Sequence, residues 1–583
     1  MFQRFSTLVL SLALAGTVAA TAPRAPMAQS GDVLPFVEVA KLIGNPEDGS
    51  AFGEAVAADG DTVVVGTGFE FGGAAQSGAA YVFQRDQGGP NAWGLVKRLT
   101  AGVETSFAHF GESVAISGDL ILVGARGDNA TSVLGSGAAY VFNRNQGGSN
   151  NWGQVAKLEA GDPGALDWFG AAVAIDGGVA IVGAERDASR AGSAYVFGQN
   201  QGGAGNWGQV KKLTASDAAQ NDGFGSSVGI SGETVVIGAP GDDHPLENNA
   251  GSAHVFQRNS GGAGNWGAVK KLLGADFEGG DLFGESAAID GDTIFVGAPS
   301  NDNAAGLQAG TVHVFGRDHG GADNWGQSQQ LFHPNAVQND RFGQEVSIDG
   351  DLAVVGARLD DDGAIDAGAV HVLERTTIQQ PASWEFIDKL TASDAEQSAL
   401  FGFAASISGR TVVVGALETE VDGNGSAGAA YVFGESACET LLDSASAVPN
   451  GFGAPFDVFA PDDLLLAATC GNDVARLEVG KGDPDQIIYR YGYELVNGQW
   501  QRLDLTGNVL LGGLWWRGSA SADRPWTATQ QGQTNVFLAY VCTSTGSEWK
   551  CGCRDATCAQ SFWQVQGYEV PAGDGSGALA SGR

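Results

Sequence analysis

The chain has 583 residues, of which 90 are glycine and 17% are charged, with a formal net charge of -36 at pH 7. This length exceeds one ordinary hydrophobic core, so the chain forms either several domains or one large repeat array. The acidity argues against nucleic acid as a partner, because a negative surface repels phosphate groups. Abundant glycine with few charged residues favours an all-β protein over a disordered one.

Residues 1–22 have the pattern of a secretory signal peptide. Arg4 precedes an apolar run from Leu8 to Ala15, and Val18-Ala19-Ala20 offers a small-residue cleavage site. The alternative is a membrane anchor, but the run falls short of the roughly 20 apolar residues that a spanning helix needs. We therefore expect cleavage, no membrane span in the mature chain, and a secreted, periplasmic or cell-surface location.

A unit of four short segments recurs between residues 34 and 435. Its first segment begins with Phe-Gly, and a glycine in a Gly-Ala or Gly-Thr step always follows 14 residues after the Phe. An Asp-Gly or Ser-Gly pair lies between them, which predicts a tight two-residue hairpin. The seven Phe-Gly pairs begin at Phe52, Phe110, Phe169, Phe224, Phe283, Phe342 and Phe401.

The remaining segments of each unit also have strand character. The second, such as Val63-Val64-Val65, is apolar without alternation, which predicts a strand buried on both faces. The third begins at a glycine and the fourth ends at a leucine, with Trp six residues earlier in most units; we expect these tryptophans to pack between sheets.

The segment Phe36–Leu42 matches a fourth segment but precedes the first unit, whereas the seventh unit stops after Phe433 without one. The N-terminal strand is therefore expected to complete the last sheet. This predicts a seven-bladed β-propeller, a closed ring with few exposed strand edges.

Two units contain the complete pattern of Phe-Gly followed by Gly-Ala-Pro, at Phe224/Gly238-Ala239-Pro240 and Phe283/Gly297-Ala298-Pro299. This pattern resembles the FG-GAP repeat of integrin α-subunit propellers and their bacterial relatives. The resemblance implies a propeller with a binding rather than a catalytic role. In calcium-binding members an Asp-rich loop separates the two strands, but here it is reduced to Asp290-Gly291-Asp292 or less. Because Ca²⁺ takes six to eight oxygen ligands, we expect no calcium in these hairpins and no other cofactor.

Two of the four loops in each blade are uniform, and the two on the opposite face vary in length and content. Variable loops on a rigid scaffold usually carry binding. They are also acidic, which indicates either a solvated rim or a docking surface for a basic or metal-bridged partner. The candidate binding residues are Asp217, Asp222, Asp242, Asp243, Asp276, Asp281, Asp360, Asp361, Asp362, Asp366, Glu418 and Asp422.

The sequence contains no nucleophile elbow, phosphate-binding loop or dinucleotide fingerprint. His254, His313 and His371 occupy the third-segment position of Tyr81, so they are expected to be packing rings. The other histidines, His333 among them, show no metal-ligand spacing. We predict neither catalytic nor metal-binding residues.

Residues 438–570 carry all six cysteines and predict a small β-sandwich-like domain, with a disordered tail at 571–583. The last four cysteines allow a zinc site or two disulfides, and export favours disulfides. The disulfide candidates are Cys438, Cys470, Cys542, Cys551, Cys553 and Cys558.

Taken together, these patterns predict an exported, non-enzymatic, adhesion-type propeller that is monomeric and binds an extracellular protein or glycan. The alternative is a secreted enzyme or accessory protein acting on polysaccharide, which requires two carboxyl groups within roughly 5 to 9.5 Å in a cleft.

Overall fold

The computed structural model describes residues 36–435, apart from 46–48, 90, 130–131, 202, 245–246, 277, 334 and 377–382, together with the strands of residues 438–571. Within these residues, no helix has the length and apolar character needed to cross a bilayer. The predicted signal peptide at 1–22 lies outside them.

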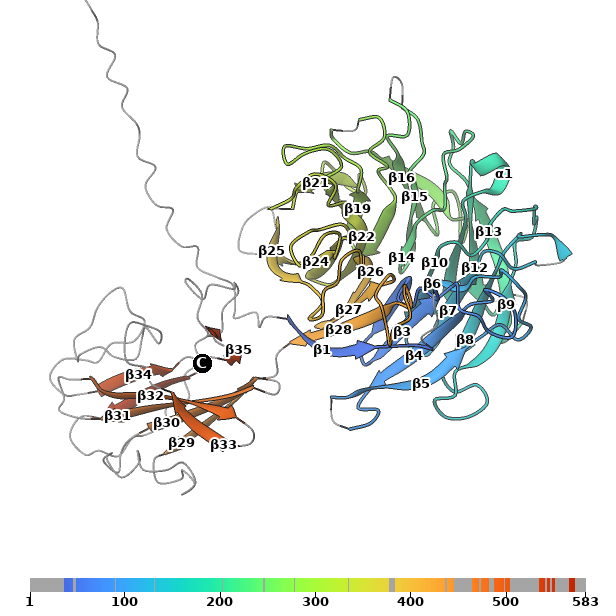
Figure 1. Cartoon of the computed structure of the whole chain (residues 1–583). Coiled ribbons are helices and arrows are strands. Elements are labelled where there is room, and N and C mark those ends of the chain that lie inside the picture. The colour runs from blue at the N-terminus through green and yellow to red at the C-terminus, as the bar shows by residue number, and fades with distance from the viewer. Residues whose placement is uncertain are drawn as a thin grey trace, which may run out of the picture. The chain divides into compact units, whose positions relative to one another are not determined.

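Residues 36–435 form seven four-stranded antiparallel sheets (Figure 1), which we number as blades. Blade 1 contains β2 (Ala55–Asp59), β3 (Thr62–Thr67), β4 (Ala79–Arg85) and β5 (Trp93–Leu99), and blade 2 contains β6 (Phe110–Ser117), β7 (Leu120–Ala125), β8 (Ala138–Asn143) and β9 (Gly153–Leu158). Blade 3 contains β10 (Val173–Asp176), β11 (Val179–Ala184), β12 (Ser193–Gln199) and β13 (Trp207–Leu213), with the single turn α1 (Asp187–Arg190) between β11 and β12. Blade 4 contains β14 (Val228–Ser231), β15 (Thr234–Ala239), β16 (Ser252–Gln257) and β17 (Gly267–Leu272), and blade 5 contains β18 (Ser286–Asp290), β19 (Thr293–Ala298), β20 (Thr311–Gly316) and β21 (Gly326–Leu331). Blade 6 contains β22 (Phe342–Asp349), β23 (Leu352–Ala357), β24 (Ala369–Thr376) and β25 (Ser383–Leu390), and blade 7 contains β26 (Phe401–Ser408), β27 (Thr411–Ala416), β28 (Ala429–Glu435) and the N-terminal β1 (Phe36–Leu42).

The first strands of the blades form the inner wall of a closed ring. Each contacts the first strand of both neighbouring blades, and β2 of blade 1 contacts β26 of blade 7. The last blade is completed by β1, which pairs antiparallel with β28 so that Phe36 lies opposite Glu435 and Leu42 opposite Ala430. Phe36 and Leu42 are buried. The predicted seven-bladed propeller, closed by its N-terminal strand, is confirmed.

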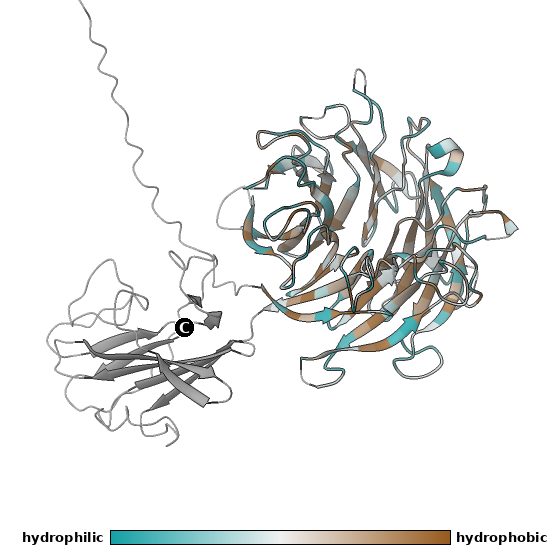
Figure 2. Cartoon of the chain, in the orientation of Figure 1, coloured by the Kyte–Doolittle hydropathy of each residue, from teal (hydrophilic) through white to brown (hydrophobic). Residues whose placement is uncertain are grey.

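The hydrophobic core lies between adjacent blades. All six residues of β3 are buried, as are those of most other second strands, because each is covered by the neighbouring sheet on either side. Figure 2 shows the hydrophobic residues along the strands of the ring. The Phe of each Phe-Gly pair meets the third-strand Tyr or His edge-on, with centroids 5.4 Å apart for Phe52 and Tyr81. Trp152, Trp266 and Trp325 are fully buried, as the predicted packing role requires.

Backbone contacts between blades explain why glycine recurs as the next-to-last residue of each second strand. A Cβ atom at Gly238 would lie 1.9 Å from the carbonyl oxygen of Gly284 in the next blade, so only glycine permits the approach. The same contact recurs at all seven interfaces, where such an atom would lie within 2.2 Å of that oxygen: Gly66 with Gly111, Gly124 with Gly170, Gly183 with Gly225, Gly238 with Gly284, Gly297 with Gly343, Gly356 with Gly402, and Gly415 with Gly53.

The tight turns are also linked around the ring. The Asp or Ser before each turn glycine accepts a hydrogen bond from the backbone N–H of the turn glycine in the next blade, and Ser408 of blade 7 returns to Gly60 of blade 1. These acceptors and donors are Asp59 and Gly118, Ser117 and Gly177, Asp176 and Gly232, Ser231 and Gly291, Asp290 and Gly350, Asp349 and Gly409, and Ser408 and Gly60. The side chains of these Asp and Ser residues therefore join blades on the uniform face.

The C-terminal region contains a five-stranded sheet of β29 (Cys438–Ser444), β30 (Leu464–Cys470), β31 (Asp473–Lys481), β32 (Ile487–Val496) and β33 (Gln499–Leu503). Two further pairs are β34 (Thr534–Ala539) with β37 (Gln566–Pro571), and β35 (Thr543–Thr545) with β36 (Glu548–Lys550). In the register of β29 and β30, Cys438 lies opposite Cys470. Cys542, Cys551, Cys553 and Cys558 lie outside the described residues, so the disulfides and the β-sandwich stay predictions.

Candidate functional site

Charged side chains from several blades meet where the inner strands begin. Glu54, Glu112, Glu285 and Glu345 lie at the starts of the first strands, just after the Phe-Gly pairs, and the loops that follow the second strands supply the other charges. Both sets belong to the face that carries the variable loops. We call the set the central charge cluster: Glu54, Glu112, Arg126, Glu185, Arg186, Glu285, Arg341, Glu345 and Arg358.

Most contacts of this cluster lie within one blade, and Arg126 of blade 2 links it to Trp168 of blade 3. Arg126 forms an ion pair with Glu112, and both Arg126 and Arg186 stack on the ring of Trp168, at 4.2 and 3.0 Å from its centroid. Glu54 accepts a hydrogen bond from the backbone N–H of Gly68 at 3.1 Å. The cluster is thus a pre-organised network of both signs rather than a simple acidic rim.

Burial in this confined space changes the titration of the carboxyl groups. It raises the pKa of Glu345 from the ordinary 4.5 to about 8. Burial, together with the neighbouring Glu54, raises the pKa of Glu112 to about 8, although Arg126 opposes the shift. Burial likewise raises the pKa of Glu54 to about 7. Each of these groups therefore takes up a proton at a higher pH than an exposed glutamate does, and the ion pair of Glu112 with Arg126 is complete only above that pH.

As the pH rises from 5 to 8, we expect the Glu345→Gln variant to lose less free energy of unfolding than the wild type does. A carboxyl whose folded pKa is raised from 4.5 to about 8 binds more protons folded than unfolded, so its contribution is complete below pH 4.5 and is lost as pH rises through 8. Glutamine cannot titrate, so the difference between wild type and variant should change by roughly 1–3 kcal/mol over this interval. Urea unfolding of both proteins at several pH values measures this difference in the free energy of unfolding. If the two stabilities changed in parallel with pH, the raised pKa of Glu345 would be contradicted. Taking the difference removes the contribution of groups common to both proteins, such as His254.

A cavity of about 540 Å³ opens beside this cluster, where variable loops of blades 3, 4 and 5 converge. Its polar lining combines two carboxylates, Glu185 and Glu285, with the guanidinium of Arg190. Asn221, Ser226 and Asn249 add hydrogen-bonding groups. The cavity can hold a polar group of mixed or positive charge.

Four of the predicted acidic residues are buried and hold the loops together. Asp222 and Asp281 accept hydrogen bonds from the backbone N–H groups of Ala219 and Glu278, at 2.6 and 2.7 Å. Asp242 forms an ion pair with Lys271 at 2.5 Å. Asp360, the fourth, accepts two hydrogen bonds from the Lys389 ammonium group at 2.9 and 2.8 Å.

The other predicted carboxylates lie at the surface of the variable loops. Several of them also have local partners: Asp217 pairs with Lys271 at 2.7 Å, Asp276 accepts a hydrogen bond from Gln330, and Asp362 pairs with Lys389. Asp366 is half-buried, and the exposed members of the set are Asp217, Asp243, Asp276, Asp361, Asp362, Glu418 and Asp422. Their part in binding a partner stays a prediction.

None of the predicted acidic residues is among the described residues that line the cavity. The sequence did carry a signal for the cavity and the cluster: a glutamate directly follows Phe-Gly at Glu54, Glu112 and Glu285, and an arginine follows Gly-Ala at Arg126 and Arg358. Because each charge belongs to a different repeat, only the closed ring brings them together.

Seven antiparallel sheets around one axis, with a strand from the opposite end of the repeat array closing the last sheet, define a β-propeller built from sequence repeats. The FG-GAP repeat model matches every blade, at residues 36–83, 93–142, 152–197, 207–256, 266–315, 325–373 and 384–433. The chain belongs to the FG-GAP repeat family. No curated protein matches it.

Proposed function

We propose that the protein is an exported, non-enzymatic propeller of the adhesion type, which presents its variable face to an extracellular protein or glycan. The observation that carries this proposal is the 540 Å³ polar cavity at the convergence of variable loops from three blades. FG-GAP propellers are often used in binding, and loops on a rigid scaffold are the usual place for it.

The charges of the cavity indicate the kind of group it receives. Glu185 and Glu285 provide two carboxylates and Arg190 one guanidinium, within a chain of net charge -36. We infer a partner that inserts a cationic or zwitterionic group, such as a lysine side chain or an amino sugar. The acidic loops around the cavity favour the approach of such a partner, and raised salt should slow its association.

This proposal predicts that Glu285→Gln weakens binding of a cationic protein or amino-sugar glycan at least about tenfold, because the carboxylate paired with the inserted cation is removed. Binding to immobilised glycans and basic extracellular proteins, measured by surface plasmon resonance, tests it. The matched control is Glu233→Gln, which removes a carboxylate from the tight turn after Ser231 on the uniform face. Equal affinity of wild type and E285Q, or equal losses in both variants, would contradict the proposed site.

A secreted enzyme acting on polysaccharide is the second candidate, and one observation favours it. Glu285 lies in the same cavity as Glu185, and burial together with that neighbour raises the pKa of Glu285, as in a carboxyl that acts as a general acid. Hydrolysis of a polysaccharide by wild type but not by E285Q would establish this alternative and overturn the non-enzymatic proposal.

A further inference from the structure

Blade 6 differs from its neighbours in the surroundings of its third-strand histidine. His254 in blade 4 and His313 in blade 5 occupy the equivalent position, and the Nε2 atom of each faces a hydroxyl group, Ser252 Oγ at 3.0 Å and Thr311 Oγ1 at 3.2 Å. In blade 6 the residue at this hydroxyl position is Ala369. The Nε2 atom of His371 is buried and has no hydrogen-bond partner among the described residues.

The imidazole of His333 lies against that of His371. His333 follows β21 at a position where the other blade connections carry only alanine or glycine, and its ring centroid is 4.0 Å from that of His371. His333 is buried, with 5% of its surface exposed. The residues at the equivalent position of the other connections are Gly44, Ala101, Ala160, Ala215, Gly274 and Ala392.

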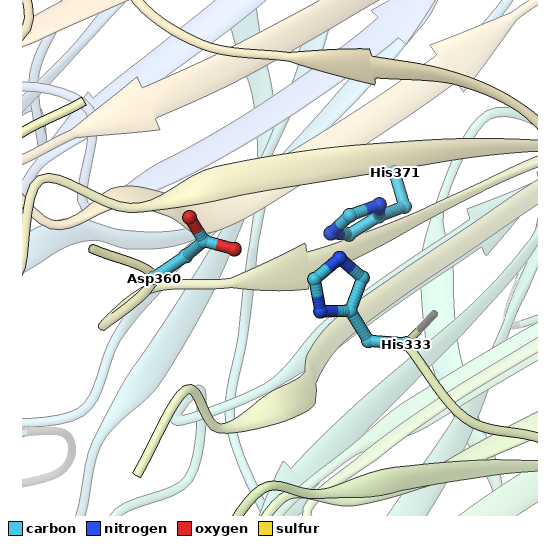
Figure 3. A group of neighbouring side chains, drawn as sticks. All are labelled: His333, Asp360 and His371. Atoms are coloured by element: carbon cyan, nitrogen blue, oxygen red, sulfur yellow. The ribbon is translucent and has the colours of Figure 1, made fainter. Parts of the chain in front are cut away.

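Asp360 completes a group of three possible ligands. One ligand atom each from His333, Asp360 and His371 lies within 4.8 Å of the others, and all three residues are buried. Figure 3 shows the two imidazole rings facing one another, with the carboxylate of Asp360 to one side. Blade 5 lacks this set, because Gly274 and Asn301 stand where blade 6 has His333 and Asp360.

We propose that His333, Asp360 and His371 bind one divalent transition-metal ion of the zinc class. Two imidazoles and one carboxylate suit Zn²⁺, which accepts three protein ligands and leaves a fourth position for water or a partner group. Calcium and magnesium prefer all-oxygen sites, so they do not fit this set.

The surrounding residues match the second layer of a metal site. Nδ1 of His333 is buried and has no hydrogen-bond partner among the described residues; Oδ2 of Asp340 lies 3.8 Å from it, beyond hydrogen-bond distance, and the other oxygen of that carboxylate is also buried without such a partner. A carboxylate on the far nitrogen orients a metal-binding imidazole. Lys389 donates to both oxygens of Asp360 and also pairs with Asp362, so it can release one Asp360 oxygen to the metal while keeping ionic partners.

Zinc binding by the full-length chain, purified without a histidine tag and with its thiols alkylated, tests the site. Isothermal titration with Zn²⁺ should show one site per chain, and Co²⁺ should give the visible absorption of a low-symmetry site. His333→Ala and His371→Tyr, which install residues found at these positions in other blades, should each weaken binding more than about 100-fold. Asp340→Asn should weaken it about 10- to 100-fold, as for the loss of an orienting carboxylate.

The matched control is His313→Tyr in blade 5, which should bind Zn²⁺ as the wild type does. Circular dichroism shows whether each variant folds. If H371Y does not fold, the zinc affinity of H333A alone tests the site. The proposal is overturned if the wild type takes up no Zn²⁺, or if H333A binds it as tightly as the wild type. It does not rest on the proposed function of the variable face, so a failure of either leaves the other standing.

Discussion

Replacing Gly238 by alanine should destabilise the propeller by about 4 kcal/mol or more. The new Cβ atom would lie 1.9 Å from the carbonyl oxygen of Gly284 and 2.3 Å from Ser227 Oγ, so the backbones of blades 4 and 5 must separate. Such a separation disturbs the buried layer between the two blades as well as the local contact. Equilibrium unfolding in guanidinium chloride measures the change.

Gly232→Ala is the control for backbone conformation alone. Gly232 has a φ of +57°, but an added Cβ atom would meet nothing within 4 Å. This variant should cost only about 1–2 kcal/mol, the strain of a left-handed alanine. If the two substitutions cost the same, the close approach between blades is not what requires glycine at position 238.

Deleting the chain through Ile43 should abolish the stable closed propeller. The deletion removes β1 with the buried Phe36 and Leu42, whose truncation to alanine would already cost about 2–5 kcal/mol each. It also exposes the edge of β28, and an unpaired edge strand favours pairing between molecules. We expect a lower unfolding midpoint and larger species in size-exclusion chromatography.

Adding the peptide of residues 34–44 to the truncated chain provides the control. Because the peptide can occupy the vacant edge, it should restore the elution volume of the parent chain and raise the unfolding midpoint. A truncated chain that elutes like the parent and is as stable would show that β1 is not needed to close the ring.

The ring could be predicted from the sequence because its determinants are local and repeated. Each determinant concerns one hairpin or one sheet edge. The fixed distance from Phe283 to Gly297 and the turn at Asp290-Gly291 define a hairpin, and the N-terminal strand at residues 36–42 defines a sheet edge. Because seven copies of the unit share this pattern, they predict a ring of seven similar sheets. The prediction of buried second strands followed from the same local pattern.

The sites could not be predicted in the same way, because their residues meet across blades. Glu185 and Glu285 belong to blades 3 and 5, and nothing in either repeat shows that they share a cavity. The spacing between His333 and His371 matches no linear ligand motif, yet the fold places their ring centroids 4.0 Å apart. Conversely, Asp222 was expected to face a partner but holds its own loop through a bond to Ala219, a local role that composition alone does not distinguish.

The strand that closes the ring also sets an order of events during synthesis. Phe36 emerges early from the ribosome, but its partner Glu435 follows about 400 positions later. Blades 1 to 6 each contain only consecutive strands, so they can assemble as they appear, whereas blade 7 must wait. Until β28 of the last repeat has been made, β1 has no partner strand, so the ring can close only after all seven repeats have been synthesised.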